Sequence, residues 1–444
     1  MTSRVRQEET ELITMSMDLQ LSLLASGEDA RKAIPKFRCR SCDAPLQTSF
    51  VDLGMSPLCQ THIAPEQLHE MEPFYPLHAY ACDECFLVQL QEFVTPGEIF
   101  SEYAYFSSYS TSWVEHARRY VEMICGRLGL GSASRVVEIA SNDGYLLQHF
   151  VARGVPALGI EPAANVARAA TERSVPTLVR FFGRETAGQV AEEHGQADLI
   201  IGNNVLAHVP DLNDFVAGLR ALLAPTGVVT MEFPHLARLM EGNQFDTIYH
   251  EHFSYFSFVA VERVFARHGL TLFDVEELPT HGGSLRIYAR HQAHEALALS
   301  DRARSLRARE VAEGFLTRER YAGFGRQVEA TKRRLLAFLI EARDQGKRVA
   351  GYGAPGKGNT LLNYCGIRTD FLEFTVDANP YKQGKYTPGT RIPIHAPEAI
   401  RAAKPDYVLI LPWNLKDEIS RHAAYVREWG GRFVVPIPEV RVLD

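Results

Sequence analysis

Short apolar runs alternate with helical segments between residues 134 and 231, and few folds accommodate such a rhythm. Helical spacing of apolar residues is clearest at 145–153. The strand-like runs, rich in β-branched residues, lie at 135–140, 157–161, 198–202 and 228–233. Strand–helix–strand repeats of this kind build a parallel sheet with helices on both faces. The sequence therefore predicts an α/β fold whose ligands bind at the carboxyl ends of the strands.

The turn after the first strand, residues 138–144 (EIASNDG), combines an acidic start with small residues. Small residues let the backbone approach a ligand, and the next helix N-terminus attracts an anionic group. The turn resembles the acidic-x-Gly-x-Gly-x-Gly turn of class I S-adenosyl-L-methionine-dependent methyltransferases. Ala140 and Asn142 replace two glycines; alanine keeps the space, and asparagine tolerates positive φ. Glu161 ends the second strand, where such enzymes bind the ribose hydroxyls of the cofactor.

Two asparagines follow the fourth strand, where a methyltransferase lines the methionyl and substrate side of its site. The predicted cofactor-binding residues are Glu138, Ala140, Ser141, Asn142, Asp143, Gly144, Glu161, Asn203 and Asn204. A helix at 259–268 precedes two further strands at 270–276 and 285–290. Together with the turn that joins them, these strands fit the antiparallel edge that closes a methyltransferase sheet. Residues 291–345 are predicted to be a helical connector with an amphipathic run at 321–343.

A second strand–helix–strand unit begins near residue 347, and its first turn is 351–360 (GYGAPGKGNT). Three glycines, with Asp377 downstream, fit a dinucleotide-binding fingerprint. The same turn fits a P-loop through Lys357, except that Gly358 stands where Ser or Thr holds magnesium. Both patterns direct backbone N–H groups at a phosphate group. The alternative interpretation of this segment is a tight glycine turn that binds no ligand. The predicted substrate-binding residues are Gly353, Ala354, Gly356, Lys357, Gly358, Asn359, Thr360, Tyr381 and Lys382. Strands at 407–411 and 432–436 are expected to continue this sheet.

Four of the seven cysteines form two C-x-x-C pairs in a chain with no recognisable export signal. Two such pairs offer zinc a complete set of four thiolates with no open position. We therefore predict a structural zinc site, with free thiols as the alternative. Its expected ligands are Cys39, Cys42, Cys82 and Cys85. Cys59 lies in the folded insert between the pairs and is expected to be buried, as are Cys125 and Cys365.

Residues 246–255 (DTIYHEHFSY) gather two histidines, a glutamate and two tyrosines in an insertion after the fifth strand. A solvated loop is the simplest interpretation. Its position above the expected methyl donor instead favours proton transfer, and His252 is a better candidate base than His250. His208, just beyond the fourth strand, is either a structural histidine or a substrate contact. The Tyr- and Ser-rich stretch 98–117 is either a packed aromatic connector or a hydroxyl-rich wall of the site.

The totals exclude several classes of function. A net charge of −7 and a pI near 6.2 give no reason to expect nucleic-acid binding. No apolar run approaches the roughly 18 residues of a membrane helix.

The 444 residues suggest two or three domains. Residues 1–34 are expected to be a disordered tail and not a signal peptide, and Met15 or Met17 is a possible start. We expect a cytoplasmic monomer or weak homo-oligomer.

Taken together, the motifs resemble those of the sugar C-methyltransferases, which act on nucleotide-linked keto-deoxysugars. The resemblance covers residues 37–440 and rests on the four-cysteine region, VVEIASNDGYLL, GIEPAANVA, NNVLAHVPD, EFPH, QFDTIYHEHFSY, PTHGGSLR, VAGYGAPGKGNT and VDANPYKQG. It implies a zinc module at 35–97, a central methyltransferase domain at 98–295, and a C-terminal Rossmann-like domain at 296–444. The substrate would lie between the last two.

The resemblance also implies roles in catalysis. His252 is the implied base, with Glu251 and Tyr249 beside it, and His208 and Tyr103 match other active-site positions. The base would remove the proton α to the ketone, and the enolate carbon would take the methyl group. Hydroxyl or imidazole donors would hold the enolate oxygen. Thymidine is the family's usual nucleoside, and we expect the target to be C-3 of a thymidine-diphosphate-linked 4-keto-6-deoxysugar. The alternatives are an O- or N-methyltransferase on a nucleotide sugar, an NAD(P)-linked oxidoreductase and a non-catalytic sugar-nucleotide-binding protein.

Overall fold

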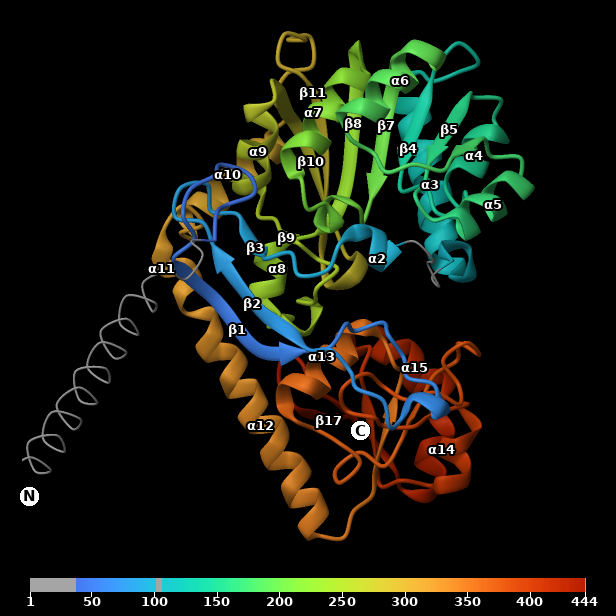
Figure 1. The fold of residues 1–444 in the computed structure, drawn as a ribbon, viewed down its shortest axis with the longest axis vertical. Helices are drawn as coiled ribbons and strands as arrows, with labels where there is room; N and C mark the ends of the chain where they lie inside the picture. The colour runs from blue at the N-terminus through green and yellow to red at the C-terminus, as the bar shows by residue number, and fades with distance from the viewer. Residues whose placement is uncertain (1–36, 101–105, 444) are drawn as a thin grey trace, which may run out of the picture.

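The computed structural model describes residues 37–100 and 106–443, whose strands form three separate sheets (Figure 1). The expected tail at 1–34 and the candidate Tyr103 lie outside these residues. Within the described ranges, no helix has the length and apolarity needed to cross a bilayer. The two larger sheets are mainly parallel and carry helices, which confirms the predicted α/β class.

The central sheet has seven strands in the order β10-β11-β8-β7-β4-β5-β6. Its strands are β4 (Val136–Ile139), β5 (Ala157–Ile160), β6 (Thr177–Leu178), β7 (Ala197–Asn203), β8 (Leu223–Pro234), β10 (Leu270–Leu278) and β11 (Ser284–His291). Neighbours from β6 to β8 pair in parallel, whereas β11 runs antiparallel to both β8 and β10. This reversal is the closing edge that the two late strands predicted.

Helices cover both faces of this sheet because successive strand side chains point to opposite sides. On one face α3 (Thr111–Leu128), α4 (Leu147–Val151) and α5 (Ala164–Glu172) share a core with Val136. On the other face, α6 (Arg184–His194), α7 (Leu212–Leu222) and α9 (Phe258–Arg267) share a core with Val137. The carboxyl ends of the strands are left uncovered by these helices and lead into the site.

The zinc module contributes a smaller antiparallel sheet, β1-β2-β3-β9. Its strands are β1 (Thr48–Ser56), β2 (Tyr75–Ala81), β3 (Val88–Leu90) and β9 (Ser254–Tyr255), and α2 (Pro96–Phe100) follows them. β9 belongs to the histidine-rich stretch, and its Tyr255 pairs with Val88 of β3. The stretch expected to lie above the methyl donor is therefore also the edge strand of the zinc module.

The C-terminal sheet has the strand order β14-β13-β12-β15-β16-β17, the 3-2-1-4-5-6 order of a Rossmann fold. Its strands are β12 (Val349–Tyr352), β13 (Thr375–Val376), β14 (Ile394–His395), β15 (Tyr407–Ile410), β16 (Arg432–Val435) and β17 (Arg441–Leu443). The associated helices are α13 (Gly356–Cys365), α14 (Glu398–Ala403) and α15 (Lys416–His422). The strand order reverses between β12 and β15, where such sheets bind ligands.

Helices outside the sheets connect the three parts: α8 (Leu236–Glu241), α10 (Asp301–Ala312), α11 (Arg318–Ala322) and α12 (Phe324–Asp344). The long helix α12 runs beside β1 and down to the C-terminal sheet (Figure 1). At its start, Phe324 stacks on Phe50 of β1 with ring centroids 4.5 Å apart. The predicted connector is thus a rigid element packed on the zinc module.

Candidate active site

One large cavity lies where the three parts of the chain meet. Its volume is about 2080 Å³, larger than the roughly 300–1,000 Å³ of a site for one small molecule. Gln60 of the zinc module, Asn203 at the end of β7 and Trp413 after β15 all line it. The cavity therefore has room for two ligands, one at the edge of each parallel sheet.

The predicted cofactor turn is built from residues in the left-handed conformation. Ala140, Asn142 and Gly144 have φ angles of 54°, 50° and 75°, which favour glycine. The two residues that replace glycines therefore keep a glycine-like backbone. At Gly144 a Cβ would lie 3.0 Å from Val175 Cγ2 and 3.2 Å from Ala170 Cβ, so only glycine fits there.

Two buried carboxyls face this turn. Glu161 Oε2 accepts a hydrogen bond from the Asn142 amide at 2.9 Å, which leaves each oxygen a further lone pair for a ribose hydroxyl. Glu138 is 1% exposed, and neither of its oxygens has a partner among the described residues. Burial, then the charges of Glu161 and Asp143, raises the pKa of Glu138 well above its usual range. These groups fit a ligand rich in hydroxyl and amino donors, as S-adenosyl-L-methionine is.

The predicted cofactor residues divide into a cavity wall and a layer behind it. Those that line the cavity are Ala140, Asn142, Glu161, Asn203 and Asn204. Those behind it are Glu138, Ser141, Asp143 and Gly144. Asp143 pairs with Arg173 at 2.8 Å and accepts a hydrogen bond from the Ser108 amide, so it fastens the turn to the segment before α3.

The cavity also contains rings that the motifs did not single out. The Trp113 ring lies 4.9 Å from that of His116 and 5.1 Å from that of His281. His281 Nε2 lies 3.1 Å from Asn204 Nδ2, and burial lowers the pKa of His281 to about 4. The available signal was the His-Gly-Gly turn between two predicted strands, which places His281 at the same edge as Asn204.

His252 lines the cavity, and a backbone carbonyl sets its tautomer. Its Nδ1 lies 2.9 Å from the Thr247 carbonyl oxygen. A carbonyl can only accept, so Nδ1 carries the hydrogen and Nε2 keeps a lone pair. Burial, and then the neighbouring His208, lowers the pKa of His252 well below its usual value. The ring is therefore neutral at neutral pH and able to accept a proton.

Two side chains flank this imidazole. The His208 ring lies 4.7 Å from the His252 ring, and the Tyr249 ring lies 4.0 Å from it on another side. Burial lowers the pKa of His208 to about 4, so it too is neutral, and its hydrogen bond with the Glu251 backbone partly opposes that shift. Both residues line the cavity. The arrangement is a neutral base beside two candidate hydrogen-bond donors.

The two residues before His252, His250 and Glu251, make their side-chain contacts elsewhere, although Glu251 also lines the cavity. The Cys59 thiol lies 3.8 Å from Glu251 Oε1, so the Thr247 carbonyl and not Glu251 orients the His252 ring. Burial raises the pKa of Glu251 to about 7. His250 turns toward the zinc module, where its Nε2 lies 3.2 Å from the Pro76 carbonyl oxygen.

On the C-terminal side, Lys357 is the predicted substrate residue that reaches the cavity. Its Nζ lies 4.7 Å from the centre of the Trp413 ring and 2.7 Å from Asn414 Oδ1. Burial lowers the pKa of Lys357, and the charge of Asp246 only partly offsets the cost of removing the ammonium from water. A cation beside a half-buried aromatic ring that lines the cavity suits a phosphate group next to a nucleoside base.

The rest of the glycine turn is covered by the insert between the cysteine pairs. A Cβ at Gly356 would lie 2.9 Å from Cys59 Sγ, and Asn359 Nδ2 donates to the Cys59 carbonyl at 2.7 Å. Asp377 Oδ2 accepts from the Ala354 amide at 2.8 Å and from Lys382 Nζ at 3.5 Å, its Oδ1 accepts from the Asn379 amide at 2.8 Å, and the residue does not line the cavity. These contacts oppose a dinucleotide at the fingerprint. The predicted substrate residues that do not line the cavity are Gly353, Ala354, Gly356, Gly358, Asn359, Thr360, Tyr381 and Lys382, and their direct contact with a ligand stays a prediction.

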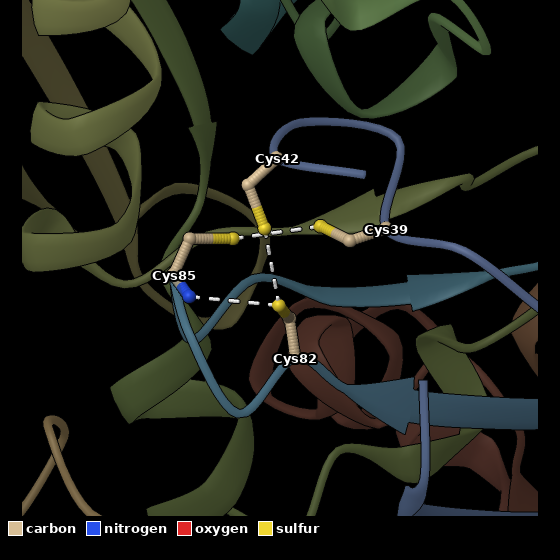
Figure 2. A group of neighbouring side chains, drawn as sticks. All are labelled: Cys39, Cys42, Cys82 and Cys85. Atoms are coloured by element: carbon tan, nitrogen blue, oxygen red, sulfur yellow. Dashed lines mark hydrogen bonds between the residues drawn. The ribbon is translucent and has the colours of Figure 1, made fainter. Parts of the chain in front are cut away.

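The two C-x-x-C pairs converge, as Figure 2 shows. Cys39 Sγ lies 3.5 Å from Cys85 Sγ, Cys42 Sγ lies 3.4 Å from Cys82 Sγ, and all four sulfurs lie within 4.8 Å of one another. Sulfurs bound to one zinc at about 2.3 Å in a tetrahedron are about 3.8 Å apart, so this donor set fits zinc. Thiolates would fill every position, which makes the site structural.

Comparison with known proteins decides the family. The C-methyltransferase NovU of Streptomyces niveus is 37% identical over 415 residues, which make up 92% of this chain and 97% of NovU. The chain belongs to the C-methyltransferase family. Three domain families match this C-methyltransferase in order: a zinc binding domain at 39–100, a methyltransferase domain at 113–275 and a C-methyltransferase C-terminal domain at 279–438.

Other relatives of the C-methyltransferase match a shorter part of it. A ubiquinone biosynthesis O-methyltransferase of Rhodopseudomonas palustris (strain BisA53) is 25% identical over 97 residues, 22% of this chain and 38% of that protein. The PH0226 protein from Pyrococcus horikoshii OT3 aligns with 45% of this chain and 99% of its own, at 16% identity and a TM-score of 0.35. The family match and the four-cysteine cluster confirm the predicted enzyme class and its cofactors, S-adenosyl-L-methionine and structural zinc.

Proposed function

We propose that this C-methyltransferase methylates a ring carbon α to the ketone of a nucleotide-linked keto-deoxysugar. The specific target that we propose is C-3 of a thymidine-diphosphate-linked 4-keto-6-deoxysugar. One observation carries the proposal: His252, whose Nδ1 is held by the Thr247 carbonyl, lines the same cavity as the cofactor turn and Lys357. A carbon atom must be made nucleophilic before it can take a methyl group. A base between the methyl donor and a phosphate-binding cation supplies that step.

In this proposal His252 Nε2 removes the α-proton, and the Nδ1–H group held by the Thr247 carbonyl keeps the ring oriented while it is charged. Tyr249 and His208 donate to the developing enolate oxygen, and Tyr103 is a further proposed donor. Glu251 changes the charge of the site between its protonated and ionised forms, because its pKa of about 7 lets it gain or lose a proton near neutral pH. When bound, S-adenosyl-L-methionine supplies the electrophilic methyl group that the enolate carbon accepts.

The nucleotide end is assigned to the C-terminal sheet. Lys357 would pair with the pyrophosphate, and the Trp413 ring would offer a flat surface to the sugar or base. The backbone from Gly353 to Thr360 supports Lys357 from behind, at the start of α13. The size of the cavity is consistent with a sugar nucleotide beside the methyl donor.

The test uses purified enzyme in heavy water with a nucleotide-4-keto-6-deoxysugar and S-adenosylhomocysteine in place of the donor. We expect exchange of the α-hydrogen by NMR, slowed at least about 100-fold in His252→Asn because the general base is lost. His250→Asn is the matched control, since that ring faces the Pro76 carbonyl outside the cavity. Equal exchange in His252→Asn and wild type would refute the base, and a methyl group on oxygen in the full reaction would favour the O-methyltransferase alternative.

A further inference from the structure

The side chain of Arg40 leaves the first zinc knuckle and enters the methyltransferase domain. Its residue lies between two of the zinc ligands in sequence. Nη1 donates to the Pro210 carbonyl at 2.7 Å, and Nη2 donates to the Leu90 carbonyl. The guanidinium carbon lies 5.3 Å from the centre of the Phe253 ring. One side chain thus joins the knuckle, β3 and two loops of the active site.

Those two loops carry the histidines of the proposed chemistry. Phe253 directly follows His252 in the sequence, and Pro210, whose carbonyl accepts from Arg40, lies two residues after His208. The Phe253 amide donates to the Ala207 carbonyl at 2.7 Å, and the Leu90 amide donates to the Phe253 carbonyl at 3.0 Å. A backbone ladder therefore runs from the zinc module through the His252 loop to the His208 loop, and the guanidinium bonds both ends of it.

The backbone of Arg40 is itself fixed by the knuckle. Its amide donates to Gln89 Oε1 at 2.9 Å, while Gln89 Nε2 donates to Cys39 Sγ at 3.1 Å. From the methyltransferase domain, Asn213 Nδ2 donates to the carbonyls of Arg40 and Ser41 at 3.0 and 3.1 Å. The geometry of the four sulfurs consequently sets where the guanidinium lies.

The surroundings of the guanidinium argue for a role in position more than in stability. Its hydrogen-bond acceptors are neutral carbonyls, and its buried Nε has no partner among the described residues. Arg40 is half-buried, and Glu92 and Asp211 act on it only through their charge, without a hydrogen bond among the described residues. The guanidinium is therefore held in place mainly by the two backbone carbonyls.

We propose that Arg40 is a positioning residue that transmits the zinc-fixed geometry of the knuckle to His208 and His252. The inference rests on the proposed function in one respect, that these histidines handle the proton. Their rings lie 4.7 Å apart, and a displacement of about 1 Å in such a pair costs about 100-fold in rate. The zinc site then serves catalysis directly through this side chain, in addition to holding its own fold.

The test compares Arg40→Met with Arg38→Met in the full-length, zinc-loaded enzyme. Methionine keeps the apolar stem and removes both donors. We expect Arg40→Met to keep its zinc and its S-adenosyl-L-methionine affinity, and to lose about 10- to 100-fold in kcat at similar KM. Amide hydrogen exchange should accelerate in peptides covering 205–210 and 252–256. Arg38 lies in the same knuckle but points outward to Asp43 at 2.6 Å, so its variant should match wild type in every readout.

Arg40→Lys keeps the charge but cannot make both bonds at once, so it should fall between wild type and Arg40→Met. Full kcat or unchanged amide exchange in Arg40→Met overturns the proposal. Loss of zinc from both Arg40 variants also overturns it, because the arginine would then hold the metal site and not the histidines. If wild type itself does not methylate nucleotide keto-sugars, the proposed function fails, while the exchange comparison still tests Arg40.

Discussion

His208, His252 and Glu251 approach the cavity from neighbouring segments, and burial is the largest cause of the pKa shift in each. The two imidazoles have lowered pKa values, while the pKa of the carboxyl is raised to about 7. Desolvation disfavours the charged form in each case. The site therefore holds neutral groups: each imidazole can accept a proton and become a cation, and the Glu251 carboxyl can lose its proton near neutral pH.

The raised pKa of Glu251 predicts that this residue destabilises the fold at alkaline pH. The native carboxyl holds its proton up to about pH 7, against 4.5 as the usual value, so stability falls as pH rises through this window and stays lower above it. Glu251→Gln should gain little over wild type at pH 5 and about 3 kcal/mol at pH 8, measured by urea unfolding. The exposed Glu66→Gln is the control, with no such trend. A pH-independent difference for Glu251→Gln would contradict the prediction.

The elements differ in how visible they were in the sequence. Strands β4, β5, β7 and β8 were predicted because apolar, β-branched runs sit at regular spacing. Helix α3 was missed although Ser110 caps it and Ala117, Tyr120, Val121 and Ile124 recur at helical spacing. The density of Tyr and Ser around 98–117 concealed that periodicity. The start of α3 at Thr111 shows that residues 111–117, the last third of this stretch, are helix.

Other features had no local signal at all. The pairing of β9 with β3 joins residues far apart in the sequence, and a two-residue strand has no periodicity to detect. The cover that Cys59 lays over Gly356 likewise depends on how two domains dock. His252 and Lys357 were predicted from motifs and both line the cavity, whereas the contacts of His281 and Arg40 are with neighbours that only the fold brings close.

The cofactor turn predicts opposite effects for two glycine substitutions. Gly144→Ala should destabilise the protein by about 1–2 kcal/mol from the left-handed φ alone, and weaken S-adenosyl-L-methionine binding, because the turn must shift away from Val175. Gly188→Ala in α6 meets no atom within 4 Å and should stabilise by about 0.5–1 kcal/mol. Urea unfolding and calorimetric titration of the cofactor measure both. Unchanged cofactor affinity in Gly144→Ala would show that the turn does not approach the ligand closely.

At the scale of the whole molecule, the cavity depends on how the C-terminal domain docks onto the rest. Trp413 Nε1 donates to Asp246 Oδ2 at 2.7 Å across this boundary, and Asp246 is fully buried. Burial raises the pKa of Asp246 to about 6. The cavity face of the C-terminal sheet is thus tied to the segment that precedes His252.

A double-mutant cycle tests this tie. Trp413→Phe and Asp246→Asn should be coupled by about 1 kcal/mol in the free energy of unfolding, because Trp413→Phe removes the buried bond and Asp246→Asn replaces its ionisable acceptor with a weaker neutral one. Trp429→Phe is the matched control, since its Nε1 donates at 2.9 Å to the Pro405 carbonyl within the C-terminal domain. Its effect should add to that of Asp246→Asn within about 0.5 kcal/mol. Additivity of the first pair would mean that other contacts hold the domains together.

The edge strand β9 has a consequence for how the protein is made on the ribosome. The zinc-binding cysteines emerge first, yet the sheet beside them stays incomplete until Ser254 and Tyr255 have left the exit tunnel. The nascent zinc module therefore displays the open edge of β3 during most of the synthesis of the central domain, and such edges attract wrong partners. A fragment ending before residue 254 would keep that edge permanently, so the zinc module and the central domain are best expressed, shuffled or inherited as one unit.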